Sequence, residues 1–213
     1  MKIKSVLFLT PRRSDRYLGG VEKHVKILSE KLREKGIGVD ELSLSNIDVK
    51  NNKLKAWLYL WKNRKSILSS DIIHIHDVFW WYSPFRFLFF WKPVFITYHG
   101  WEGVYPPSKS AIFQKKVANL FCRGSIGVGK YLERWYGVRL DEVTYGATEN
   151  LKFKIKNLKL KKSSKYIVVL GRLEEVNGIN IVLEALNKLN RKVIFVGDGS
   201  YREKCEKYGK VTG

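Results

Sequence analysis

The stretch that decides the fold is SVLFLTPRRSDRYLGGVEKHVKILSEKLREKG, residues 5–36. Its first six residues form a mostly apolar run, which is typical of a strand buried on both faces of a parallel sheet. After a polar loop, residues 21–36 carry apolar side chains at helical spacing and end in a glycine, which indicates a helix and its stop. A buried strand followed by a helix is the repeating unit of open α/β sheets, so the stretch predicts an α/β fold.

The alternation of strand and helix continues along the chain. Further strands are expected at 39–45, 71–78, 93–100, 125–128, 142–146, 166–171 and 192–199, and a last helix opens in 200–210. The composition changes over 151–165, which is rich in lysine. We therefore predict a Rossmann-like parallel-sheet domain over 1–150, a basic linker over 151–165, and the start of a second Rossmann-type domain over 166–213.

The composition restricts the partners and the compartment. The 213 residues include 40 Lys and Arg against 20 Asp and Glu, which gives a net charge of +20. Such a charge attracts anions: nucleic acid, anionic lipid headgroups or phosphorylated small molecules. The two cysteines lie outside any C-x-x-C motif and indicate neither a disulfide framework nor a metal knuckle, which fits a reducing, cytoplasmic location. No uninterrupted apolar run reaches the ~18 residues that a membrane span requires.

Residues 124–130, GSIGVGK, match the G-x-x-x-x-G-K pattern of a phosphate-binding P-loop. That loop needs a buried strand before it and a Ser or Thr after the lysine to ligate Mg²⁺. Here Tyr131 follows the lysine, and residues 111–123 have the pattern of a helix. We interpret the match as a short strand that enters a helix after a turn glycine.

Seven segments follow one another along the chain: GGVEKHV (19–25), DIIHIHD (71–77), ITYHG (96–100), SIGVGKYLERWYGV (125–138), VTYGATE (143–149), VVLGRLEEVNGINIVLEAL (168–186) and VIFVGDGSYREKCE (193–206). They resemble, in the same order, segments of the retaining glycosyltransferases of family 4, which have the GT-B fold. No single segment is specific, and the order of all seven carries the resemblance. It implies an acceptor-side first domain and a donor-binding second domain, with a nucleotide-diphosphate sugar as co-substrate and no metal or other cofactor.

The resemblance also implies a set of site residues. Because the leaving group is a diphosphate, catalysis mainly requires stabilisation of an anion. Catalytic roles fall to His99 and Arg172, and the nucleotide sugar is expected to contact Gly19, Gly20, Gly171, Arg172, Asn177 and Gly178. On the residues alone, plainer roles fit as well: a flexible turn for the first two glycines, a solvated arginine, and a histidine that caps a turn.

Two departures from the family pattern bear on activity. The family has a lysine where this sequence has Asn177, so the expected grip on the diphosphate loses one positive charge. The family also continues to an E-x(7)-E motif that holds the sugar and the ribose, and residue 213 is reached before that motif.

His74 and His76 share one face of the expected strand, and an H-x-H pair can bind a metal. Asp77 and Glu102 are conceivable further ligands, but no third ligand is clear. We therefore predict no metal site.

Residues 79–91, FWWYSPFRFLFFW, contain more consecutive aromatics than one buried helix face can hold. We expect Pro84 at the first position of a helix over 83–91. Together with the basic, Trp-bearing helix over 53–68, the segment suits the interface of an anionic membrane, so a peripheral position at the inner face is expected. Core packing and dimer packing are the alternatives.

The predicted function is transfer of a sugar from a nucleotide-diphosphate sugar to an acceptor, with retention of configuration. A lipid-linked compound is one option for the acceptor. The alternative is a non-catalytic or half-enzyme subunit that anchors a second chain at the membrane; a homo-oligomer is also left open. A basic protein that binds single-stranded nucleic acid is the alternative of a different class, and the glycosyltransferase-like segments count against it.

Overall fold

A computed structural model describes residues 2–14, 19–44, 52–100, 106–145, 166–189 and 191–213. The chain divides into two compact units, Met1–Asn150 and Leu151–Gly213, and each is considered by itself. The expected basic linker over 151–165 lies outside the described residues, as does Glu102.

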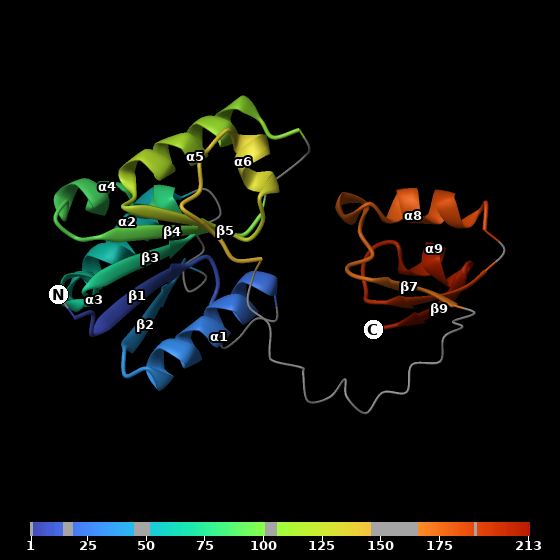
Figure 1. Ribbon diagram of the computed structural model, residues 1–213, viewed down its shortest axis with the longest axis horizontal. Coiled ribbons are helices and arrows are strands. Elements are labelled where there is room, and N and C mark those ends of the chain that lie inside the picture. Colours follow the sequence, from blue (N-terminus) through green and yellow to red (C-terminus); the bar gives the residue numbers. More distant parts are fainter. Residues whose placement is uncertain (1, 15–18, 45–51, 101–105, 146–165, 190) are drawn as a thin grey trace. The chain divides into compact units, whose positions relative to one another are not determined.

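The first unit is built on a six-stranded parallel sheet in the order β2-β1-β3-β4-β5-β6 (Figure 1). The strands are β1 (Ser5–Thr10), β2 (Gly38–Ser43), β3 (Ile72–His76), β4 (Val94–Tyr98), β5 (Gly124–Gly127) and β6 (Glu142–Val143). β1 pairs with β2 on one side and with β3 on the other. The strand order therefore reverses between β1 and β3, and ligands of open α/β sheets bind outside the carboxyl ends of the strands at such a point.

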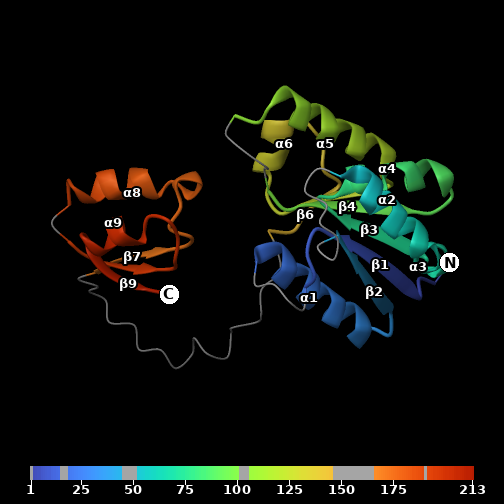
Figure 2. The same cartoon turned by 180° about the vertical axis from the view of Figure 1, so that it is seen from behind.

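Helices cover the two faces of this sheet unequally. One face packs against α1 (Gly20–Glu34), the one helix among the described residues that lies there in both views (Figures 1 and 2). The other face carries α2 (Lys53–Lys62), α3 (Arg64–Ser69), α4 (Phe79–Leu88), α5 (Lys109–Phe121) and α6 (Tyr131–Tyr136).

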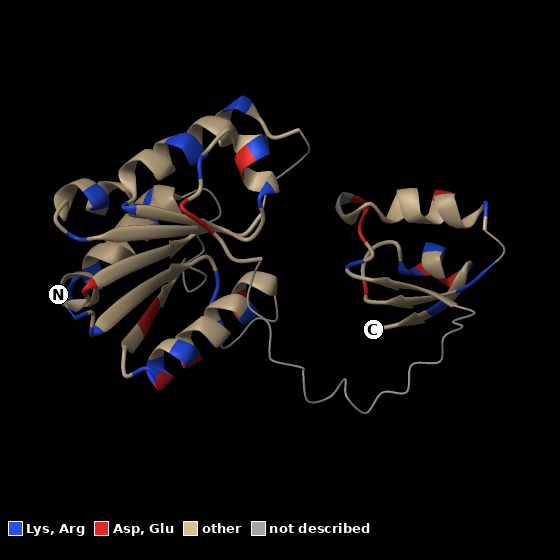
Figure 3. Cartoon of the chain, viewed as in Figure 1, with Lys and Arg blue, Asp and Glu red and all other residues tan. Residues whose placement is uncertain are grey.

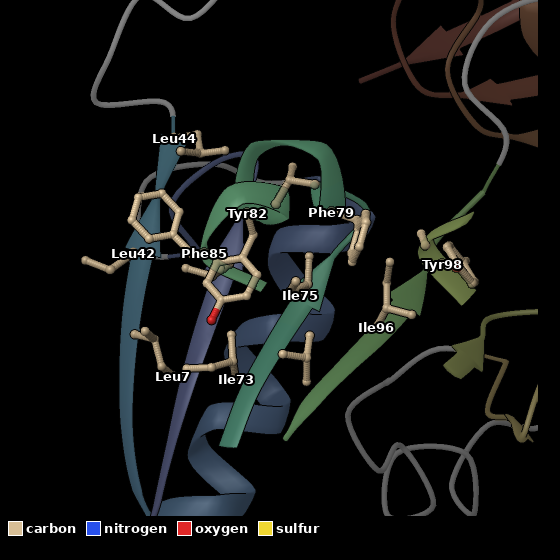
Figure 4. Packing of buried hydrophobic residues seen from close by; sticks show 14 of the residues in the cluster. Leu7, Leu42, Leu44, Ile73, Ile75, Phe79, Tyr82, Phe85, Ile96 and Tyr98 are labelled. Atoms are coloured by element: carbon tan, nitrogen blue, oxygen red, sulfur yellow. The ribbon is translucent and has the colours of Figure 1, made fainter. Parts of the chain in front are cut away.

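Alternation along the strands explains both layers. On β1, Val6 and Phe8 pack toward α1, whereas Leu7 and Leu9 belong to the larger core under the helices of the other face. Figure 4 shows this core, in which side chains of the strands meet Tyr82 and Phe85 of α4. Successive side chains of a strand point to opposite faces, so a strand that is apolar throughout is buried on both sides.

Pro84 lies inside α4, because the helix begins at Phe79. The expectation of a helix starting at Pro84 is therefore wrong. Proline has no N–H to donate to the carbonyl of Trp80, four residues earlier, and the hydroxyl of Ser83 donates to that carbonyl instead, at 3.1 Å. A neighbouring side chain thus compensates for the proline and lets the helix start earlier.

The second unit holds a three-stranded parallel sheet of β7 (Tyr166–Leu170), β8 (Lys192–Val196) and β9 (Gly209–Thr212). A 3₁₀ turn, η2 (Glu175–Asn177), leads into α8 (Ile179–Leu186), and α9 (Arg202–Glu206) connects β8 to β9. Phe195 is buried with residues of both helices, whereas Val168 and Leu170 are 60% and 80% exposed. Among the described residues, helices therefore cover only one face of this sheet.

The described parts of the chain contain no helix that is both long and apolar enough to cross a bilayer. The protein thus has the predicted α/β fold, with a Rossmann-type first unit.

Candidate active site

All four histidines of the sequence meet at the carboxyl edge of the first sheet, at the point where the strand order reverses. His24 comes from α1, His74 and His76 come from β3, and His99 follows β4. The predicted catalytic residue His99 therefore lies where sites of α/β sheets gather. His24 was not predicted; its only signal is its position in the first helix, one turn beyond the glycine pair.

The four rings are in direct contact. Nδ1 of His76 and Nε2 of His99 lie 2.8 Å apart and share a hydrogen bond. The ring of His24 meets that of His99 edge-on, with centroids 4.9 Å apart, and the ring of His74 stacks on that of His76 at 4.5 Å. Nε2 of His74 forms a hydrogen bond with the hydroxyl of Thr97 at 2.8 Å.

Burial keeps these imidazoles uncharged. It lowers the pKa of His74 and His99 to about 3, the pKa of His76 well below its usual value, and the pKa of His24 in the same direction. Three of the rings are buried, and only His99 is half-buried. His99 is therefore the member that can offer a neutral donor or acceptor to a bound molecule, held in place by His76.

Asp77 fixes the backbone at His99. Its carboxylate accepts a hydrogen bond from the backbone N–H of His99 at 3.1 Å and forms an ion pair with Nζ of Lys115 at 3.0 Å. Asp77 has φ +62°, a left-handed conformation that costs a non-glycine residue ~1–3 kcal/mol. Burial raises the pKa of Asp77, while Lys115 acts in the opposite direction.

A cavity of about 250 Å³ opens beside this ion pair. Nζ of Lys115 lies over the rings of Tyr98 and Tyr136, at 4.8 and 5.7 Å from their centroids. Trp80, Trp81 and Gln114 also line the cavity. Sequence reasoning considered Asp77 only as a conceivable metal ligand and missed Lys115, because the two residues are 38 positions apart. Among the described residues, no group of three or more His, Cys, Asp or Glu side chains is arranged to hold a metal ion.

Gly19 and Gly20 lie at the start of α1, at the same edge, and both are exposed. Gly19 is the N-cap and provides no side-chain cap. The buried carboxylate of Glu22 reaches back to this turn, since a Cβ on Gly19 would lie 2.0 Å from its Oε2. This carboxylate places a negative charge at the positive end of the helix, where an anionic ligand would compete with it. Contact of the two glycines with phosphate stays a prediction.

The other predicted residues lie together in the second unit, between β7 and α8. Gly171 follows β7, and Gly178, with φ +78°, is the N-cap of α8 without a side-chain cap. Arg172 and Asn177 lie between them and are exposed. An exposed guanidinium and an uncapped helix start, here in the same connection, can each approach an anion without displacing core contacts.

The loop after β8 contacts the loop between β7 and α8. It was not predicted as part of the site. A Cβ on Gly197 would lie 1.9 Å from the carbonyl oxygen of Gly171, so the two backbones touch. The carboxylate of Glu174 accepts hydrogen bonds from the N–H and the hydroxyl of Ser200, at 2.9 and 2.6 Å. The Gly-Asp-Gly sequence after β8 was the available signal, because such glycines permit close approach of two chain segments.

No protein-family model and no curated protein matches the sequence. Solved structures do match over nearly the whole chain. The structure of Anabaena Alr3699/HepE in complex with UDP and glucose has a TM-score of 0.61 at 15% identity and covers 99% of this chain and 69% of that chain.

Two further structures come from Rickettsia, and each covers 100% of this chain and 69% of its own. A glycosyltransferase from Rickettsia africae has a TM-score of 0.56 at 19% identity. A UDP-N-acetylglucosamine 2-epimerase from Rickettsia bellii has a TM-score of 0.51 at 12% identity. Likeness at such low identity shows the fold alone, so family 4 membership and retention stay predictions. The chain has the GT-B fold.

Proposed function

We propose that the protein is a glycosyltransferase-like enzyme that takes its sugar from a nucleoside-diphosphate sugar. The observation that supports the proposal is the likeness of the whole chain to three solved structures: a complex with UDP and glucose, a glycosyltransferase, and a UDP-N-acetylglucosamine 2-epimerase. Transfer with retention and a lipid-linked acceptor are further parts of the proposal, and they rest on the resemblance of the sequence segments.

In this proposal the second unit binds the diphosphate of the donor. Arg172 can form two parallel hydrogen bonds to phosphate oxygens, and the uncapped N-terminus of α8 at Gly178 adds backbone donors. Asn177 supplies a neutral amide where a lysine is expected. Arg172 therefore carries more of the charge stabilisation of the leaving group than it would beside a lysine.

In the first unit, His99 is proposed to contact the transferred sugar or the acceptor. Its ring is neutral, so it can donate to or accept from a hydroxyl group without adding charge. Asp77 and His76 hold its backbone and ring, which reduces the freedom that binding would otherwise have to remove. No metal or other cofactor is part of the proposed chemistry.

Nucleotide binding tests the proposal directly. Titration calorimetry with UDP and GDP is expected to show binding that Arg172→Ala weakens by about 10- to 100-fold, because a hydrogen-bonded charge pair contributes ~1.5–3 kcal/mol. Arg172→Lys should fall between, since it keeps the charge but loses the paired geometry. Arg191→Ala removes an exposed arginine from the amino end of β8 and serves as the matched control.

Turnover completes the test. The folded protein should hydrolyse or transfer from at least one nucleotide sugar, and Arg172→Ala should reduce the rate. A folded protein that binds no nucleotide and turns over no nucleotide sugar would overturn the proposal.

A second candidate is the half-enzyme subunit, and the one-sided sheet of the second unit favours it. Val168 and Leu170 form part of an apolar sheet face that no described helix covers, which a second polypeptide chain would bury. This candidate predicts that turnover appears only when a partner chain is added. Turnover by the chain alone contradicts it.

A further inference from the structure

Four of the five helices on one face of the first sheet carry no acidic residue; the fifth, α6, contains Glu133. Lys and Arg occur three times in α2, twice in α3, once in α4 and three times in α5, and none of the four helices contains Asp or Glu. α1, on the opposite face, mixes cations with Glu22, Glu30 and Glu34. The blue and red segments of Figure 3 show the same contrast. The positive charge of this unit is therefore unbalanced on one side.

Apolar side chains project outward from the same layer. On α2, Leu54, Leu58 and Trp61 are spaced four and three residues apart and are 61%, 53% and 47% exposed. The opposite side of α2 buries Ala56 and Leu60 in the core. The outer stripe is therefore an additional apolar face and not the packing face of the helix.

A second group of exposed apolar side chains lies at the turn after α4. Phe90 and Trp91 are exposed, at 72% and 58%. Lys92 anchors this turn beside the end of α3, because its Nζ donates to the carbonyls of Leu68 and Ser70. Leu68 is itself exposed, so the end of α3 adds to the apolar surface.

The structure also corrects which aromatics of 79–91 reach solvent. Phe79, Tyr82, Phe85 and Phe89 are buried in the core, and Trp80 and Trp81 are half-buried against it. Core packing thus accounts for the first part of the segment, and the exposed aromatics are those near its end.

Cations border the exposed apolar side chains. The guanidinium of Arg64 lies 4.9 Å from the ring centroid of Trp61, and Lys55, Lys62 and Lys65 are exposed on α2 and α3. Aromatic and aliphatic side chains beside cations, on helices that contain no acidic residue, match the layered chemistry of an anionic bilayer surface: apolar below and negatively charged above. A protein partner would have to supply a dense acidic patch around an apolar centre to match it equally well.

We propose that the surface formed by Leu54, Leu58, Trp61, Leu68, Phe90 and Trp91, with its bordering cations, docks the protein onto an anionic membrane. Phe90 and Trp91 precede β4 and so lie at the amino edge of the sheet. The histidine cluster lies at the carboxyl edge, and Leu54, at the start of α2, follows Lys53, which lines the cavity beside Asp77. The inference goes beyond the proposed function and does not depend on it.

Flotation with lipid vesicles tests the docking without any sugar chemistry. The full chain should float with vesicles of phosphatidylcholine containing about one-third phosphatidylglycerol, and salt should weaken the binding, as expected for attraction between charges. Phe90→Ser with Trp91→Ser should reduce it strongly; both side chains are exposed, so the fold should be retained, as circular dichroism can verify.

Two double variants with the same change in net charge distinguish the effect of charge at this surface from the effect of the overall net charge on vesicle binding. Lys62→Glu with Lys65→Glu should weaken vesicle binding at least about tenfold, because each cation near an anionic surface contributes measurably. Lys26→Glu with Lys35→Glu changes the net charge equally on exposed positions at α1 and should leave most of the binding intact. Equal loss in both variants overturns the proposed surface.

Two other outcomes also overturn it. One is equal binding to neutral and anionic vesicles. The other is binding to single-stranded oligonucleotides without binding to vesicles, which would assign the surface to nucleic acid.

Discussion

At the scale of the residue, the strained backbone conformation of Asp77 is a feature that no sequence pattern predicts. Its left-handed backbone is maintained because the carboxylate joins the N–H of His99 to the ammonium group of Lys115. Both partners come from other elements, so the strain is offset by contacts that exist only in the folded chain.

Removing the charge of Asp77 should destabilise the first unit. Asp77→Asn can keep the left-handed backbone, which asparagine tolerates, but it leaves Lys115 without its buried counter-charge, at a cost of ~3 kcal/mol. Lys115→Met combined with Asp77→Asn should recover much of that loss. Urea unfolding followed by tryptophan fluorescence measures it, since all seven tryptophans lie in residues 1–150. A single variant as stable as the parent chain would contradict the assigned role.

At the scale of the element, the two faces of the second sheet differ in burial, although both carry apolar side chains. β7 and β8 both read as buried strands, yet helices α8 and α9 cover only the face of Phe195. Connections between neighbouring parallel strands are right-handed as a rule, and with the strand order β7-β8-β9 this places consecutive helices on the same side.

Substitutions on the two faces should therefore differ in cost. Phe195→Ala removes a fully buried ring and is expected to cost ~3–5 kcal/mol, whereas Leu170→Ser, on an 80% exposed residue, should stay within about 0.5 kcal/mol. Hydrogen exchange of the β8 amides measures the stability of the second unit, which contains no tryptophan and so gives no tryptophan fluorescence signal. A large effect of Leu170→Ser would instead show that its face is covered in solution.

At the scale of the whole molecule, the histidine cluster couples the stability of the first unit to pH. The pKa values of His74 and His99, about 3 in the folded state, lie below the usual value near 6.5, so the unfolded chain binds protons first as the pH falls. Stability should therefore be full above about pH 6.5 and decline below it, by up to about 1.4 kcal/mol per pH unit for each histidine.

Urea midpoints between pH 7.5 and 5 measure this decline. His74→Gln should reduce the slope by the contribution of one proton, because glutamine does not titrate. The raised pKa of Asp77 acts against this decline, because the folded state binds that proton more readily than the unfolded chain does. A midpoint that does not change with pH would show that the cluster is hydrated and not buried.

The strands and the site loops differ in how far local sequence predicts them. Apolar runs such as 5–10 and 72–76 specify strands by themselves, and a parallel sheet brings their carboxyl ends to one edge. Residues at strand ends and helix starts could therefore be selected from the sequence. They are His99 and the glycines at 19, 20, 171 and 178. β9 was missed, and a helix was expected in its place, because its four residues GKVT are too few and too polar for a pattern.

The sequence by itself determined the α/β class, the order of elements and the excess of positive charge, because these depend on local periodicity and composition. Only the tertiary structure decided that His24 meets His99, that Asp77 pairs with Lys115, and which aromatics of 79–91 face solvent. The physical reason is that such contacts depend on strand order and on the rotation of each helix about its axis. Both are set by packing between residues far apart in the chain, which no local pattern contains.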